Sequence, residues 1–343
     1  MSSPPASRAR RLVVIAVLVA AAGGLGWWLF APRPTTAAKK VTIGIQTSPA
    51  MATVMVAKDK GMFAAEGLDV ELQQFTAGKF ALQAFVGKSL DFSVSGEVPV
   101  CLASLQGNDI RVVAQVVERT VREVRVVART DGPVTDPAAY FKSKKRKLAT
   151  SFGGGPEFFT YNFLKKHGIR NPEDVEVLNQ KPEDMTAALE SGSVDAISVF
   201  DPFAYIAEKR LAGKVSTFAS DDLYSELYVL NVHPEQLTAD ADRITAVLKA
   251  LAAAADYIEK NPDEAQQVVA GYTKLDRDTL RGIWGSFVFR PALTPQLVEY
   301  WTAQAAWAKA TNKAPADAVV PDFRARIADG PLRAVRPAAV TLP

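Results

Sequence analysis

The sequence has 343 residues, of which 48% are hydrophobic and 22% are charged. These proportions exclude a disordered chain, and the length suggests two domains of about 150 residues each. The net charge of +3 includes four arginines within residues 1–38, where no acidic residue occurs; 36 basic and 37 acidic residues remain, so no basic surface for nucleic acid is expected. One cysteine, Cys101, and two histidines exclude an internal disulfide and disfavour a metal centre or histidine-based catalysis.

Residues 12–31 form an uninterrupted apolar run without a charge, preceded by Arg8, Arg10 and Arg11. A run of about 20 such residues is long enough to cross a bilayer as a helix. Two alternatives stay open at this point. Residues 1–38 are an export signal, of the general or the twin-arginine type, or they form an uncleaved membrane anchor with a linker. Both alternatives place the chain from about residue 40 onward in the periplasm or an equivalent extracytoplasmic space.

The exported part begins with alternating apolar residues at 41–45, which predict a strand. A helical stretch follows and ends at Gly61, and residues 68–72 predict the next strand. Helix and strand patterns continue to alternate along the chain. This order is typical of an α/β protein with largely parallel sheets.

Two segments about a hundred residues apart resemble each other. Residues 81–99 and 185–202 both read as a helix, then Gly-x-x-Asp, then a strand, then an acidic residue shortly before a proline. Gly87 and Gly192 are expected to end their helices in the left-handed conformation. Asp91 and Asp195 are expected to bond nearby backbone amides, which is a structural role. The repetition predicts two similar α/β lobes.

Ligands of open α/β sheets bind beyond the carboxyl ends of the strands, where loops and helix amino termini meet. Four loops of this sequence fall there, and their candidate ligand-binding residues are Gln46; Ser95, Gly96 and Glu97; Ser151, Gly153, Gly154 and Gly155; and Asp201. The triglycine loop precedes a predicted helix from Glu157, so its bare amides suit an anionic group. Glu97 and Asp201 occupy equivalent positions and either contact the ligand or cap the helices that follow. Tyr228 is an aromatic candidate for the same cleft.

These residues resemble the substrate-binding proteins of ABC importers for sulfonates, nitrate, taurine and thiamine-precursor pyrimidines. The resemblance runs from about Val41 to Ala310, and its most specific part is the run Gly61, Phe63, Glu66, Gly67 and Leu68. It implies a type II periplasmic-binding fold, with one lobe from residues 39–130 and 227–343 and the other from residues 131–226. It also implies two crossings between the lobes, near residues 129–134 and 218–228, and ligand-contact roles for the residues of the four loops.

The function implied is that of an exported, monomeric binding protein that captures a small organic anion or zwitterion, such as an alkanesulfonate or taurine. Its partners would be an ABC permease and the permease's ATPase, with no cofactor, no catalytic residue and no metal. Relatives often carry hydroxyl residues where this chain has three glycines, which weakens the case for a side-chain-bound sulfonate. Three alternatives remain: a binding protein for a thiamine-precursor pyrimidine, one for nitrate, or a membrane-tethered ligand sensor that is not coupled to import.

Overall fold

The computed structural model describes residues 38–120, 122–219 and 223–343. The apolar run at residues 12–31, expected to be a signal or an anchor, lies outside the described residues. Within the described ranges, no helix combines the length and the hydropathy needed to cross a membrane.

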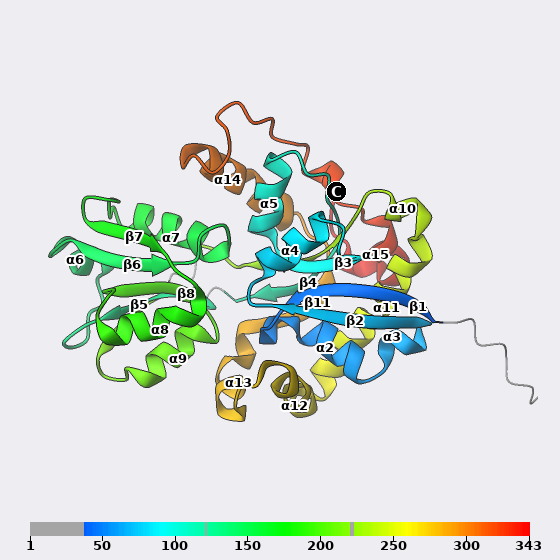
Figure 1. Ribbon diagram of the computed structural model, residues 1–343, viewed down its shortest axis with the longest axis horizontal. Helices are drawn as coiled ribbons and strands as arrows, with labels where there is room; N and C mark the ends of the chain where they lie inside the picture. The colour runs from blue at the N-terminus through cyan, green and yellow to red at the C-terminus, as the bar shows by residue number, and fades with distance from the viewer. Residues whose placement is uncertain (1–37, 121, 220–222) are drawn as a thin grey trace, which may run out of the picture. The chain divides into compact units, whose positions relative to one another are not determined.

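The first lobe is built on a six-stranded mixed sheet in the order β11-β4-β10-β3-β1-β2 (Figure 1). β1 pairs in parallel with β2 and β3, whereas β10 runs antiparallel to β3 and β4. Every residue of β3 and β10 is buried, as expected for central strands covered on both faces. The strands are β1 (Lys39–Gln46), β2 (Leu68–Phe75), β3 (Phe92–Gly96), β4 (Arg111–Arg119), β10 (Leu227–Val232) and β11 (Phe287–Ala292).

The second lobe repeats this plan on a five-stranded sheet in the order β7-β6-β8-β5-β9. β6 pairs in parallel with β7 and β8, and β5 runs antiparallel to β8 and β9. The strands are β5 (Val124–Arg129), β6 (Arg146–Thr150), β7 (Val175–Asn179), β8 (Ala196–Phe200) and β9 (Val215–Phe218). The predicted α/β architecture with two similar lobes is therefore confirmed.

Helices connect the strands and cover the sheets, as Figure 1 shows. Those of the second lobe are α6 (Pro137–Lys142), α7 (Gly155–Lys166), α8 (Pro182–Ser191) and α9 (Phe203–Arg210). Those of the first lobe are α2 (Ala52–Asp59), α3 (Met62–Ala65), α4 (Gly78–Val86), α5 (Glu97–Leu105), α10 (Gln236–Ala239), α11 (Ala241–Lys260), α12 (Pro262–Thr273), α13 (Arg277–Ile283), α14 (Gln296–Ala310) and α15 (Gly330–Val335). Four short 3-10 helices complete the list: η1 (Pro49–Met51), η2 (Trp284–Ser286), η3 (Arg324–Arg326) and η4 (Pro337–Ala339).

The two crossings between the sheets fix where the lobes meet. β4 ends at Arg119 and β5 begins at Val124, so the first crossing is residues 120–123 and not residues 129–134 as predicted. β5 belongs to the second sheet because it pairs with β8 and β9, which corrects its assignment to the first lobe. The second crossing joins the end of β9 at Phe218 to the start of β10 at Leu227, which lies within the predicted range. Both strands flanking the first crossing are apolar, and an apolar run does not reveal which sheet it joins.

The repeated Gly-x-x-Asp turns use the same bond in both lobes. Asp91 accepts a hydrogen bond from the Thr42 amide at 2.8 Å, and Asp195 accepts one from the Lys147 amide at 2.9 Å. The aspartates therefore have the predicted structural role, although each bonds the neighbouring strand. Gly192 has φ +78° and ends α8 as expected. Gly87 does not adopt this conformation; the left-handed position falls on Lys88, with φ 60°.

Candidate functional site

Side chains from the first lobe and from both crossings meet in a buried polar cluster, which comprises Gln46, Glu97, Arg119, Glu123, Glu226 and Tyr228. Gln46 ends β1, Arg119 ends β4, and Tyr228 lies near the start of β10. The acidic members lie at the start of α5 or on the crossings. Each of the six is at least 95% buried. Such a concentration of charged groups in a dry interior is costly unless the groups satisfy one another or a ligand.

Arg119 is the only cation of this cluster and is fully buried. Its guanidinium pairs with Glu123, lies 2.9 Å from a carboxylate oxygen of Glu226, and donates to the Tyr228 hydroxyl at 2.5 Å. The rings of Tyr228 and Phe200 lie 4.4 and 5.1 Å from its Cζ atom. Since Tyr228 belongs to the first lobe and Phe200 to the second, this one guanidinium contacts aromatic faces of both.

Glu226 lies between a glycine of each lobe, and we call this pair, Gly96 and Gly155, the glycine cradle. A Cβ atom added to either glycine would lie 2.6 Å from Oε1 of Glu226, so only glycine lets both backbones approach the carboxylate. Gly155 lies in the first turn of α7, directly against this carboxylate. Burial raises the pKa of Glu226, against the opposing effects of Arg119 and the Gly155 amide.

The Glu97 carboxylate is already bonded by three donors. It accepts hydrogen bonds from the Tyr224 hydroxyl, from Nε2 of Gln304 at 2.8 Å and from the Leu227 amide at 2.9 Å. Burial, followed by the charge of Glu226, raises the pKa of Glu97 to about 8. This predicted ligand-contact residue therefore ties the second crossing and α14 to the start of α5.

Asp201, the counterpart of Glu97 in the second lobe, is turned toward Arg125. Its Oδ1 atom lies 2.9 Å from Arg125 and accepts a hydrogen bond from the Tyr205 amide at 3.1 Å, which is a capping contact at the start of α9. The Asp201 amide donates to Glu123 at 3.1 Å, which links the residue to the cluster through its backbone. Burial raises the pKa of both Asp201 and Glu123, in the case of Glu123 to about 8.

The remaining predicted residues lie around the cluster with partners of their own. Ser95 accepts a hydrogen bond from Asn231 at 2.9 Å. The Lys79 amine donates to the Ser151 hydroxyl at 3.5 Å and to the Phe152 carbonyl at 2.8 Å, which is a contact between the lobes. Gly153 has φ +78°, and its amide donates to Glu157 at 2.8 Å. Gly154 is the N-cap of α7. The Gly153 amide of the triglycine loop is thus bonded to a carboxylate of the chain itself.

Several atoms of the cluster lack hydrogen-bond partners among the described residues. The donors are Nε2 of Gln46 and Nε of Arg119, and the acceptors are Oε2 of Glu123 and Oε2 of Glu226. The Glu226 atom is ion-paired with Arg119 but without hydrogen-bond geometry. Buried polar atoms of this kind cost about 1–3 kcal/mol each when they are left unpaired. The cluster is able to form further hydrogen bonds with a ligand that carries both acceptors and donors.

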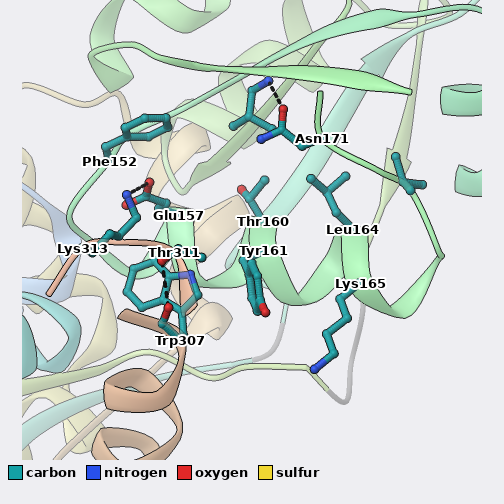
Figure 2. Close-up of a pocket in the computed structure, with 12 residues that line it drawn as sticks. Phe152, Glu157, Thr160, Tyr161, Leu164, Lys165, Asn171, Trp307, Thr311 and Lys313 are labelled. Atoms are coloured by element: carbon teal, nitrogen blue, oxygen red, sulfur yellow. Dashed lines mark hydrogen bonds and ion pairs between the residues drawn. The ribbon is translucent and has the colours of Figure 1, made fainter. Parts of the chain in front are cut away.

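A pocket of about 580 Å³ opens beside the same triglycine loop (Figure 2). Phe152 and Glu157 line it from the loop and α7, and Trp307 and Lys313 line it from α14 and the segment after it. Lys313 lies 2.5 Å from Glu157 and 4.8 Å from the Phe152 ring centroid. Tyr161 and Leu164 extend the pocket along α7, as Figure 2 shows. The pocket thus has an aromatic and apolar wall next to one ion pair.

Three residues at the centre of this site, Arg119, Glu123 and Glu226, were not predicted from the sequence, although each contacts groups of both lobes. The available signal was position. Arg119 ends the largely apolar stretch 111–119, and Glu123 and Glu226 directly precede the stretches 124–128 and 227–232, where the crossings begin and end.

Comparisons with known proteins agree with this architecture. The model of the NMT1-like family matches residues 35–273. A Bacillus subtilis protein named for binding aliphatic sulfonates is 25% identical over 71% of this chain and 73% of its own length. The crystal structure of the periplasmic aliphatic sulphonate binding protein SsuA from Escherichia coli has a TM-score of 0.72 at 19% identity, over 85% of this chain and 92% of that one. The alkanesulfonate-binding protein SsuA from Xanthomonas axonopodis pv. citri, bound to MOPS, has a TM-score of 0.71 at 19% identity, over 88% of this chain and all of that one.

Proposed function

The chain belongs to the NMT1-like family, and from this premise we propose that it is an exported solute-binding protein of an ABC importer, which captures a small organic anion or zwitterion between its lobes. The relatives reported above are named as binding proteins, and the fold of this chain matches theirs. The proposal contains no catalytic step. Its partners are a permease and an ATPase, and its location is outside the cytoplasmic membrane.

The buried polar cluster is the observation that carries the proposal. Strand ends of the first lobe, the α7 amino terminus of the second lobe and both crossings contribute polar groups to one place. A molecule bound there would contact both lobes at once, so its binding energy would favour the closed arrangement. Hinge closure around a ligand is the usual way in which a two-lobed protein converts binding into a conformational signal.

The unpaired atoms of the cluster support a ligand with groups of both signs. Gln46 and Arg119 offer donors that suit an oxyanion, and Glu123 and Glu226 offer acceptors that suit an ammonium or a hydroxyl. The apolar wall beside the triglycine loop offers space for an organic part. An aminosulfonate combines all three features, and the structural relative with bound MOPS was determined with a ligand of this class.

Thermal unfolding of the purified full-length chain with a ligand panel tests the proposal. The panel contains taurine, MOPS, ethanesulfonate, nitrate and an aminopyrimidine. A ligand present at 100 times its Kd adds about 2.7 kcal/mol, which raises Tm by about 4 °C for a chain of this size. We expect such a shift with an aminosulfonate. A shift with the aminopyrimidine or nitrate alone would contradict the proposed ligand class, and no shift with any member would contradict the binding function.

A further inference from the structure

We infer that Glu226 determines the specificity of the cleft: its carboxylate occupies the anion position of the site, and a ligand oxyanion binds by taking its place. The inference rests on the proposed function and identifies which residue of the chain competes with the ligand. It also defines the ligand's head as a compact oxyanion that fits where a carboxylate now lies.

The contacts of Glu226 are those that a bound anion would make. Its carboxylate lies against Gly155 in the first turn of α7, a helix of 12 residues whose dipole favours negative charge at this end. It lies 2.9 Å from the guanidinium of Arg119. The glycine cradle leaves no room for a Cβ atom on either side of it. One carboxylate thus uses a helix amino terminus, a buried cation and two close backbone approaches from different lobes.

The carboxylate is not ideally satisfied in this position. Its Oε2 atom has no hydrogen-bond donor among the described residues, and Nε2 of Gln46 and Nε of Arg119 have no acceptor there. A sulfonate head offers three oxygens where a carboxylate offers two. It could therefore use donors that Glu226 leaves unpaired, which provides a free-energy difference to drive the exchange.

The surrounding acidic groups also disfavour the ionised form of the Glu226 carboxylate. The charged and titratable groups that act on it are Arg119 of β4, Glu97 of α5, Glu123 of the first crossing, Tyr224 of the second crossing and Tyr228 of β10. Two of these are carboxylates, and only one is a cation. Burial raises the pKa of Glu226, so lowering the pH neutralises the internal competitor while a sulfonate stays ionised.

Isothermal titration of the full-length chain with ethanesulfonate tests the inference. The variants are Glu226→Gln, which removes the charge at nearly constant shape, and Glu190→Gln, which removes the same charge from an exposed position of α8. We expect Glu226→Gln to bind ethanesulfonate at least about tenfold more tightly than the unchanged chain, which is about 1.4 kcal/mol. Glu190→Gln is expected to change the affinity by less than about threefold, because solvent and salt screen an exposed charge. Unchanged or weaker binding by Glu226→Gln would overturn the inference.

The unchanged chain provides a second test that does not depend on a variant folding. Because the pKa of Glu226 is raised above its ordinary value of 4.5, the affinity of the chain for ethanesulfonate is expected to rise as the pH falls from 8 to 5, and this rise should be smaller in Glu226→Gln. An affinity that falls or stays constant over this range would overturn the inference. If neither protein binds a sulfonate while the aminopyrimidine still raises Tm, Glu226 is not an anion competitor, but the chain remains a solute-binding protein.

Discussion

Glu97 illustrates how a single residue chosen as a ligand contact can serve the scaffold. Its carboxylate has donors from the second crossing and from α14, and its backbone carbonyl accepts the Trp301 indole at 2.9 Å. Glu97 therefore holds α5, α14 and the second crossing together, whereas Glu226 and Arg119 contact groups of the second lobe. The residue type alone does not show whether a carboxylate at such a position contacts the ligand or stabilises the scaffold.

The raised pKa values of Glu97 and Glu123 predict how stability depends on pH. Both groups have folded pKa values of about 8, above the unfolded value of about 4.5, so the folded chain binds protons more tightly. Their contribution to stability is complete below pH 4.5 and is lost as the pH rises toward 8. We expect the free energy of unfolding to fall over this range, by at most about 1.4 kcal/mol per pH unit for each proton.

Urea denaturation of the unchanged chain and of Glu97→Gln at several pH values measures this effect. Glu97→Gln should show a shallower fall because it removes one of the titrating groups. Glu71→Gln, at an exposed position of β2, is the matched control and should keep the full slope. A free energy of unfolding that rises from pH 5 to pH 8 would contradict the prediction.

At the scale of the element, the three glycines at the amino terminus of α7 differ in why glycine is needed. Gly153 needs a left-handed backbone, with φ +78°. Gly155 needs the absence of a side chain because Glu226 lies against it. Gly154 needs neither: its backbone is extended, and the nearest atom to an added Cβ lies 3.7 Å away. The triglycine sequence suggests one flexible loop, but the structure requires glycine at only two of the three positions, Gly153 and Gly155.

We therefore predict different costs for two neighbouring substitutions. Gly155→Ala should lower the free energy of unfolding by about 1–3 kcal/mol, because the methyl group displaces a buried, ion-paired carboxylate. Gly154→Ala should change it by no more than about 0.5 kcal/mol. Repeating Gly155→Ala in a Glu226→Ala background should remove most of its cost, since the two residues contact each other directly. If Gly155→Ala lowered the free energy of unfolding equally in both backgrounds, the requirement for glycine at this position would not come from Glu226.

For the molecule as a whole, polar contacts across the cleft join the lobes in addition to the aromatic contact of Phe158 with Trp307. Lys79 of α4 donates to the Phe152 carbonyl of the second lobe at 2.8 Å, and burial lowers the pKa of this lysine. Lys313, after α14, pairs with Glu157 of α7. These contacts lie outside the buried polar cluster. They stabilise closure without any need to discriminate between ligands.

Lys79→Met is expected to shift the ligand-free chain toward more open arrangements. A partly buried charged hydrogen bond contributes about 1 kcal/mol, which corresponds to a severalfold change in a two-state equilibrium. Distances between spin labels on α2 and α8 would report this change. Lys88→Met is the control, because Lys88 pairs with Glu235 at an exposed position of its own lobe. Identical distance distributions for both variants would contradict the role given to Lys79.

How far the sequence predicts the structure depends on how far apart the interacting residues lie in the chain. Strands, helices and the repeated Gly-x-x-Asp turns were predictable because each depends on residues close together in the chain. The first crossing was misplaced because β4 and β5 have the same apolar pattern and differ only in their pairing partners. Arg119 and Glu226 were missed because they are 107 positions apart, and their contact depends on how both sheets are connected.

The bonds from Asp91 to Thr42 and from Asp195 to Lys147 also bear on the history of the chain. The same side chain binds the same kind of strand amide, at equivalent places in two sheets, as expected if one ancestral unit was duplicated and fused. The equivalent acidic residues are nevertheless held differently, because Glu97 is bonded by Tyr224 and Gln304 whereas Asp201 is paired with Arg125. The two halves of the repeat are therefore not interchangeable at the cleft.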